Sequence, residues 1–204
     1  MSRRAWVAAA AGVALVGVGG ALVAVRVRGA ISARLEPTAL EARVARTLRN
    51  WAIPSDARDA TNPIPPSQRS LAAGLAHFAD HCATCHANDG SGQTAIGRNQ
   101  YPRAPDMRRP ATQDLTDGEL FYIIENGVRF TGMPAWGGPG TAEGSWRLVH
   151  FIRHLPKLTE EERAQMEALN PKSPDEWRAL EEEDTFLRGE EPAMGETGHG
   201  AHAH

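Results

Sequence analysis

One five-residue motif constrains this chain more than any other feature. Residues 82–86 read Cys-Ala-Thr-Cys-His, and the 204-residue chain has no cysteine outside this motif. Two thiols three residues apart can form thioether bonds to both vinyl groups of a haem, and the adjacent histidine offers an imidazole nitrogen to the iron. The motif therefore predicts that Cys82 and Cys85 attach one haem c and that His86 is an iron ligand.

Other uses of a Cys-x-x-Cys pair lack the context they need. A thioredoxin-like redox pair is expected in a βαβ unit, and the sequence around the motif shows no such pattern. A structural zinc site needs a second ligand pair at suitable spacing, and no further cysteine exists. Two cysteines also exclude a framework of disulfides.

Three stretches around the motif have the apolar spacing of helices. Residues 67–82 carry apolar side chains at intervals of three and four, residues 116–126 begin with a capping box, and residues 142–155 end at a proline. Residues 87–114, rich in glycine and proline, predict a loop. A core of about ninety residues with so much loop is marginally stable alone, so a covalent haem is expected to supply the missing apolar contacts.

The second iron ligand is predicted in a turn-rich loop between the last two of these helices. Met133 stands there between Gly132 and Pro134, so its side chain projects from a constrained backbone. A thioether opposite a histidine stabilises ferrous iron, as electron transfer requires. Met107 is instead expected to pack in the core.

The N-terminal residues 1–29 predict a membrane anchor. Residues 5–25 contain no charge and are flanked by arginines on both sides, and as a helix they would span about 31 Å. A cleaved signal peptide is the alternative, but its apolar region is normally roughly 7–15 residues long and ends at a small-residue cleavage site. We therefore predict a retained, single-pass transmembrane helix.

Residues 30–65 predict an amphipathic helix followed by a stiff linker. Four apolar residues fall at helical spacing with three arginines between them: Leu40, Val44, Leu48 and Trp51, with Arg43, Arg46 and Arg49. Such a helix either lies on the membrane surface or is a plain spacer, and both interpretations are open. The prolines at 63, 65 and 66 then mark the boundary to the next domain.

Charge is distributed unevenly along the chain. The formal net charge is −3, made up of +6 over residues 1–50, −1 over residues 51–156 and −8 over residues 157–204. A nucleic-acid binder would usually show a basic excess, so we expect no nucleic-acid partner. Residues 157–191 predict an acidic extension with helices at about 160–169 and 174–187, each begun by a capping box.

Residues 192–204 predict a flexible, histidine-rich tail. His199, His202 and His204 fall within the last six residues, where they could bind copper or zinc, or form an exposed tail without that role. Two further pairs, His77 with His81 and His150 with His154, are spaced four residues apart on predicted helices. Each pair could chelate one metal ion or consist of ordinary surface imidazoles.

Residues 66–156 as a whole resemble the class I c-type cytochromes. The similarity is greatest to the single-haem, membrane-anchored bacterial kind related to the haem subunits of cbb3-type oxidases. It is carried by the haem motif and by four further stretches: Gly74-x-x-x-Phe78, His86-Ala87-Asn88-Asp89-Gly90-Ser91-Gly92, Gly132-Met133-Pro134-Ala135-Trp136 and Trp146-Arg147-Leu148-Val149-His150-Phe151-Ile152. The implied fold is all-α, a class I cytochrome c fold around one covalent haem, preceded by the transmembrane helix and followed by acidic helices and the tail.

The resemblance also implies a set of site residues. Cys82 and Cys85 would carry the haem, and His86 and Met133 would be its axial ligands. The first and last helices of the domain would cross at Gly74, Phe78 and Phe151. The carbonyl of Pro105 would accept the imidazole N–H of the iron-ligating histidine, since such a hydrogen bond orients a ligating histidine. Four residues are candidates to bind the haem propionates: Arg98, Tyr101, Arg108 and Arg109.

The implied function is that of a membrane-tethered electron carrier rather than an enzyme. Haem is attached to such apoproteins outside the cytoplasmic membrane, so the haem domain is expected on the periplasmic face of the inner membrane. Its partners would be periplasmic redox proteins or a membrane respiratory complex. Two alternatives are a haem subunit of a periplasmic dehydrogenase or oxidase complex, and a copper- or zinc-handling cytochrome that uses its histidine tail.

Overall fold

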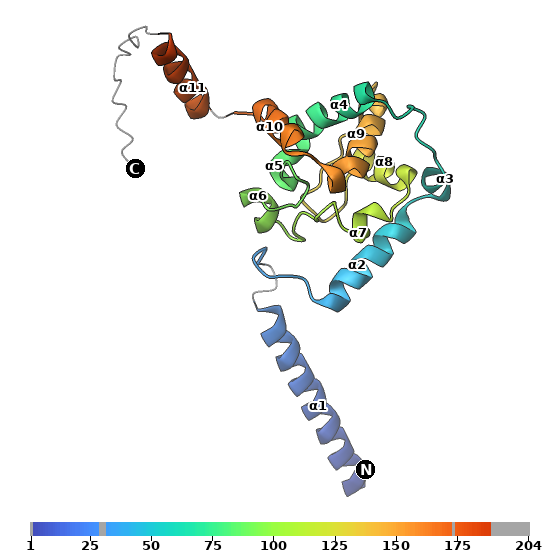
Figure 1. The fold of residues 1–204 in the computed structure, drawn as a ribbon. Coiled ribbons are helices and arrows are strands. Elements are labelled where there is room, and N and C mark those ends of the chain that lie inside the picture. The colour runs from blue at the N-terminus through green and yellow to red at the C-terminus, as the bar shows by residue number, and fades with distance from the viewer. Residues whose placement is uncertain (1, 29–31, 173, 189–204) are drawn as a thin grey trace. The chain divides into compact units, whose positions relative to one another are not determined.

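The computed structural model describes residues 2–28, 32–172 and 174–188, and within these ranges it is helical and contains no strand (Figure 1). The helices before the haem motif and at it are α1 (Arg3–Val27), α2 (Ala39–Ala52), α3 (Ser55–Arg58), α4 (Gln68–His77), the π-helix η1 (Phe78–Cys82) and α5 (Ala83–His86). Those that follow are α6 (Ala95–Asn99), α7 (Pro110–Gln113), α8 (Asp117–Asn126), α9 (Ala142–His154), the 3₁₀-helix η2 (Leu155–Lys157), α10 (Glu160–Leu169) and α11 (Pro174–Leu187). The all-α class predicted from the sequence is confirmed.

The core is centred on the crossing of α4 and α9, which contact each other more than any other pair of helices. At the crossing, a Cβ on Gly74 would overlap the carbonyl oxygen of Arg147, so only glycine allows the two backbones to come this close. One turn further, the rings of Phe78 and Phe151 lie 5.1 Å apart and both side chains are fully buried. The crossing implied by the resemblance is therefore confirmed.

The helix ends follow the predicted capping signals. Ser67 caps α4, and Thr116 and Glu119 form the predicted capping box at the start of α8. The predicted helix over residues 67–82 is continuous, but its last five residues form a π-helix in which the backbone N–H of Ala83 donates to the carbonyl of Phe78. The predicted loop over residues 87–114 also differs, because it contains the short helices α6 and α7.

The segment predicted as a linker is packed against the helices that follow it. Asn62 donates a 2.9 Å hydrogen bond to the carbonyl of Trp146, and the ring nitrogen Nε2 of His150 lies 2.8 Å from the carbonyl of Ile64. The guanidinium of Arg58 forms a 3.0 Å ion pair with the buried carboxylate of Glu119. Residues 58–64 are therefore part of the structure around the core, not a free spacer.

The C-terminal part divides at a different residue from the predicted boundary at 156. One compact unit spans Met1–Leu169 and a second spans Asn170–His204. Helix α10 belongs to the first unit because Met166 is fully buried in the core. The helices predicted at 160–169 and 174–187 are both confirmed, while the predicted flexible tail lies outside the described residues from position 189 onward.

The N-terminal segment forms one uninterrupted helix, α1 (Figure 1). Within the part of the chain that the structure describes, no helix is both long enough and apolar enough to cross a membrane. The transmembrane anchor expected from the sequence stays a prediction.

The crossing at Gly74 leads to a test of stability. We expect Gly74→Ala to lower the free energy of unfolding by about 1–3 kcal/mol, because the new methyl group must push α9 away. Chemical denaturation of the holoprotein measures the change. Gly138→Ala is the matched control, because the nearest atom to its Cβ is 3.8 Å away, and it should change stability by less than about 0.5 kcal/mol. Equal stability of the two variants would contradict the close packing of α4 on α9.

Candidate functional site

The haem motif is placed by the transition from η1 to α5. Cys82 ends the π-helix, and Cys85 and His86 lie on the short α-helix that follows. After His86 the chain turns away sharply, with Ala87 at a φ of 61°. The backbone N–H of Gly92 donates a 2.8 Å hydrogen bond to the carbonyl of His86, which fixes this turn. The sequence-predicted attachment residues are thus held together on one well-ordered turn.

His86 is buried and its imidazole is neutral at physiological pH. The residue is only 8 % exposed. Burial lowers the pKa of its imidazole to about 4, although the Pro105 carbonyl acts to raise this pKa. Its Nδ1 atom is buried without a hydrogen-bond partner. A neutral imidazole is the form that binds iron, and an unpartnered buried ring nitrogen costs about 1–3 kcal/mol unless something completes its environment.

The carbonyl of Pro105 acts on the pKa of His86, but no hydrogen bond between the two has formed. With haem bound, this carbonyl would accept the Nδ1–H of His86, as the resemblance implies, and would hold the ring in one orientation. The residues present therefore fit a haem group on this side of the site.

Neither cysteine takes part in a disulfide. Burial, followed by the proximity of Cys85, raises the pKa of Cys82 to about 12, so this thiol stays protonated. The sulfur of Cys85 accepts a 3.3 Å contact from the side-chain amide of Gln100, and its carbonyl accepts a 3.2 Å hydrogen bond from the hydroxyl of Thr94. The raised pKa of Cys82 makes its thiol a poor nucleophile.

Gln100 links the haem motif to the loop that carries Met133. Its side-chain amide, in contact with Cys85, also lies so close to Gly132 that a Cβ there would be 2.5 Å from the Gln100 Cδ atom. The structure therefore brings Cys85 and Gly132, which precedes Met133, next to the same side-chain amide. The sequence analysis missed Gln100, since nothing local distinguishes it from other polar loop residues.

The backbone of the Met133 loop is held at several points. The N–H of Val128 donates a 3.1 Å hydrogen bond to the carbonyl of Met133. The N–H of Met133 donates a 3.1 Å hydrogen bond to the hydroxyl of Thr131. Gly127 has a φ of 65°, and a Cβ on this residue would be 2.7 Å from the carbonyl oxygen of Met133. Only glycine therefore allows the Met133 carbonyl to lie this close. Met133 itself is half-buried, whereas Met107 is buried in the core as predicted.

An ion-pair network joins the turn after His86 to the segment that contains Pro105. Arg108 pairs with Asp89 and with Asp106, both at 2.8 Å. Hydrogen bonds from Arg108 lower the pKa of Asp106 to about 2. Burial acts to raise the pKa of Asp89, but hydrogen bonds from Ser91 and the charge of Arg108 leave it lowered. The network fixes the distance between the two loops that flank the imidazole.

These contacts reduce the set of propionate candidates. Arg108 and Arg109 are paired with Asp106, and the hydroxyl of Tyr101 donates to Glu41. Of the four predicted candidates, the side chain of Arg98 is the one with no hydrogen bond or ion pair to the described part of the chain. Arg98 therefore remains the candidate that needs no rearrangement.

The structure brings no metal cluster together from the remaining histidines. No group of three His, Cys, Asp or Glu side chains suited to a metal ion exists among the described residues. The Nε2 atom of His150 lies at the carbonyl of Ile64, and the Nε2 atom of His154 lies 2.9 Å from the carboxylate of Glu162. The two imidazoles therefore have different partners and do not form a chelating pair. The rings of His77 and His81 meet edge to face at 5.0 Å. His199, His202 and His204 lie outside the described residues.

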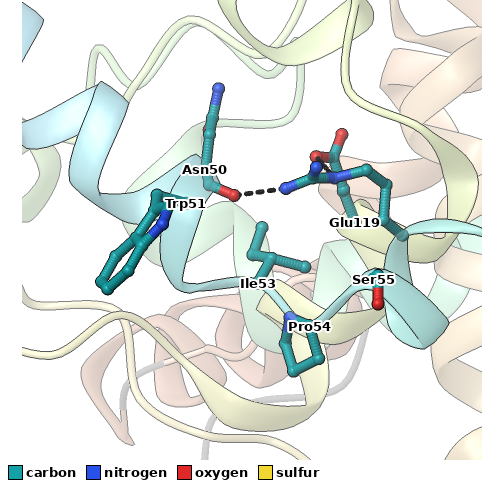
Figure 2. Close-up of a pocket in the computed structure, with 7 residues that line it drawn as sticks. Asn50, Trp51, Ile53, Pro54, Ser55 and Glu119 are labelled. Carbon is teal, nitrogen blue, oxygen red and sulfur yellow. Dashed lines mark hydrogen bonds and ion pairs between the residues drawn. The ribbon is translucent and has the colours of Figure 1, made fainter.

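One surface depression lies apart from these residues. It is lined by Asn50, Trp51, Ile53, Pro54, Ser55, Arg58 and Glu119, where α2 and α3 meet the start of α8 (Figure 2). None of the predicted haem residues contributes to it. It is therefore a feature of the junction between the N-terminal segment and the core, not part of the haem site.

Together, the helical fold, the crossing of α4 and α9 and the buried histidine of a Cys-x-x-Cys-His turn define a domain of the c-type cytochrome class. Residues 69–152 match the family described as cytochrome C oxidase, cbb3-type, subunit III. The matched segment is a c-type cytochrome domain related to the haem subunits of cbb3-type oxidases, and such a domain carries covalently bound haem c. No curated protein shows significant similarity to the chain.

The ion pair at Asp106 leads to a pH-dependent prediction. Because the folded-state pKa of Asp106 is about 2, below the ordinary value, its stabilisation is present above about pH 4 and is lost as the pH falls toward 2. We expect Asp106→Asn to lower the free energy of unfolding by about 1 kcal/mol at pH 7, with the difference disappearing near pH 2.

Urea denaturation of both proteins across this pH range measures the effect. Asp114→Asn is the control, because Asp114 is exposed and forms no side-chain ion pair with the described residues. A destabilisation of Asp106→Asn that persists unchanged to pH 2 would show that the carboxylate charge is not its cause.

Proposed function

We propose that this protein is a membrane-tethered electron carrier that cycles a single haem c between ferric and ferrous iron on the periplasmic side. The observation that carries the proposal is the buried, neutral His86 on a Cys-x-x-Cys-His turn, with the Met133 loop held nearby through Gln100. The family match supports haem-based electron transfer for residues 69–152. When bound, the haem supplies the one-electron chemistry.

The chain's own residues would hold the group and set its environment. Cys82 and Cys85 are proposed to form the thioether bonds, and His86 and Met133 to be the axial ligands. Pro105 is proposed to accept the imidazole N–H, which keeps the ring in one orientation and makes it a better donor. A thioether ligand favours ferrous iron, the redox state that an electron carrier must hold. No residue is needed for proton transfer, which fits a carrier rather than an enzyme.

The tether is proposed for α1. Eight large apolar side chains of this helix are each at least 59 % exposed: Trp6, Val7, Val13, Leu15, Val16, Val18, Leu22 and Val23. Such a helix needs an apolar environment to be stable, and the uncharged run over residues 5–25 supports a bilayer as that environment. Because haem attachment in c-type cytochromes takes place outside the cytoplasmic membrane, residues after α1 are proposed to face the periplasm.

A second candidate function is that of a haem subunit within a respiratory complex. The family description, subunit III of a cbb3-type oxidase, specifically favours it. The site would work in the same way, but the donor and acceptor would be fixed neighbours. Purification from membranes under conditions that keep complexes intact distinguishes the two, because a subunit co-purifies in fixed stoichiometry and a free carrier does not.

The axial ligand is tested by spectroscopy of two matched variants. We expect the holoprotein to contain low-spin haem with a ferric charge-transfer band near the red end of the visible spectrum. Met133→Leu should lose this band, because leucine keeps the volume of methionine but cannot bind iron. Met107→Leu, which makes the same change in the core, should retain it. Retention of the band in Met133→Leu together with its loss in Met107→Leu would refute the assignment.

The tether is tested by topology mapping. A reporter that is active only outside the cytoplasm, fused after Val25, should be active, and the mature protein should still begin near Met1. Val13→Arg with Val16→Arg is the control, because two charges at the centre of the run cost about 5–7 kcal/mol of insertion free energy and should abolish reporter activity. A water-soluble protein that begins near Ala33 would rule out a retained anchor.

A further inference from the structure

Helix α2 is amphipathic, but its apolar side faces solvent, whereas a helix that packs on a protein core buries its apolar side. None of its described side chains is buried, and four large apolar ones project into solvent: Leu40, 71 % exposed, Val44, 48 %, Leu48, 57 %, and Trp51, 82 %. At about 100° per residue these four fall within an arc of about 80° on one side of the helix. We refer to this set as the outward stripe.

The opposite side of α2 faces the haem domain. Ala42 and Arg49 are the residues of the helix that are half-buried, and they lie about 150° from the centre of the outward stripe. Burial lowers the pKa of Arg49, although the nearby Glu119 acts to raise it. The helix is therefore seated on the domain by its polar side, and the apolar side is turned away.

Polar bonds at both ends of α2 fix this orientation. At its N-terminal end, Glu41 accepts a hydrogen bond from Tyr101, and just before the helix Glu36 pairs with Arg103 at 2.6 Å. At its C-terminal end, the carbonyl of Asn50 accepts a 2.5 Å hydrogen bond from the guanidinium of Arg58. Figure 2 shows the ring of Trp51 on the side of the chain away from Glu119. Rotation of the stripe toward the core would break these bonds.

The charges beside the outward stripe indicate what covers it. Arg43 is exposed and lies on one flank of the stripe, about 100° from its centre, while the acidic Glu41 on the other flank is engaged by Tyr101. An apolar stripe with an arginine on one flank and a tryptophan at one end is the pattern of a helix that lies in the interface of an anionic bilayer. The stem of Arg43 can extend along apolar surface while its charge reaches lipid phosphates.

We propose that α2 lies in the surface of an anionic membrane through its outward stripe and so holds the haem domain against the bilayer in one orientation. This deepens the proposed function and rests on it in that α1 keeps α2 close to lipid. A tethered helix binds the bilayer as an intramolecular event, so four side chains suffice where a free helix would dissociate. The consequence is that one face of the haem domain always points at partners in or near the membrane plane.

The test uses hydroxyl-radical footprinting of the full-length holoprotein in lipid nanodiscs that each contain one chain. Mass spectrometry reads the oxidation of Trp51, with the buried Trp146 as the internal standard. In discs enriched in phosphatidylglycerol, we expect Trp51 to be oxidised several-fold more slowly than in discs of phosphatidylcholine alone, because anionic lipid attracts Arg43 on the flank of the stripe.

Two neighbouring substitutions form a matched pair. Val44→Glu puts a carboxylate into the outward stripe and should restore the oxidation of Trp51 in anionic discs. Ala45→Glu adds the same charge at an exposed position outside the stripe and should leave the protection in place. Arg43→Gln should reduce the difference between the two lipid compositions.

Three outcomes would overturn the proposal, and they are distinguishable. If the chain remains in the discs but Trp51 in wild-type protein is oxidised as fast as in Val44→Glu, α2 does not bind lipid, and the tether by α1 stands. If the chain does not stay in discs at all, both the tether and the role of α2 fail. If protection appears only in discs that contain two chains, the outward stripe is an interface between copies of the protein.

Discussion

The close crossing of α4 and α9 determines where the haem site can form. The two backbones meet at Gly74, and the adjacent phenylalanine pair is fully buried, so the end of α4 has little freedom. The five residues after α4 continue as a π-helix, which places one more residue in the turn before Cys82 than an α-helix would. The position of the attachment turn therefore follows from the packing of two helices rather than from the motif alone.

Around this rigid pair, loops form the rest of the site, and polar contacts compensate for their lack of regular structure. The ions Asp89, Arg108 and Asp106 connect the turn after His86 to the Pro105 segment. Gln100 connects Cys85 to the turn that precedes Met133. Burying an imidazole whose Nδ1 has no partner is costly, and a hydrogen bond from Nδ1 to the Pro105 carbonyl, proposed for the haem-bound protein, would remove this cost.

Local sequence signals predicted the helices and gave the proposed haem-binding residues, but they did not predict the long-range contacts. The capping box of Thr116 and Glu119 depends on residues three apart, and it is present as predicted. The same Glu119 also pairs with Arg58, 61 residues earlier, and no local pattern indicates such a contact. For this reason the segment before the domain was expected to be a linker, whereas it is docked on the core. The orientation of α2 was likewise undecidable from its periodicity, which gives an apolar face but not the direction in which it points.

The central claim is that one haem, closed to exogenous ligands, carries one electron at a time. A spectroelectrochemical titration of the full-length holoprotein measures this most directly. The account predicts a single reversible transition with the one-electron slope of about 59 mV per decade, accounting for one covalent haem per chain, and a ferrous spectrum unchanged by carbon monoxide. A two-electron slope, or immediate formation of a carbon monoxide complex by the ferrous protein, would contradict it.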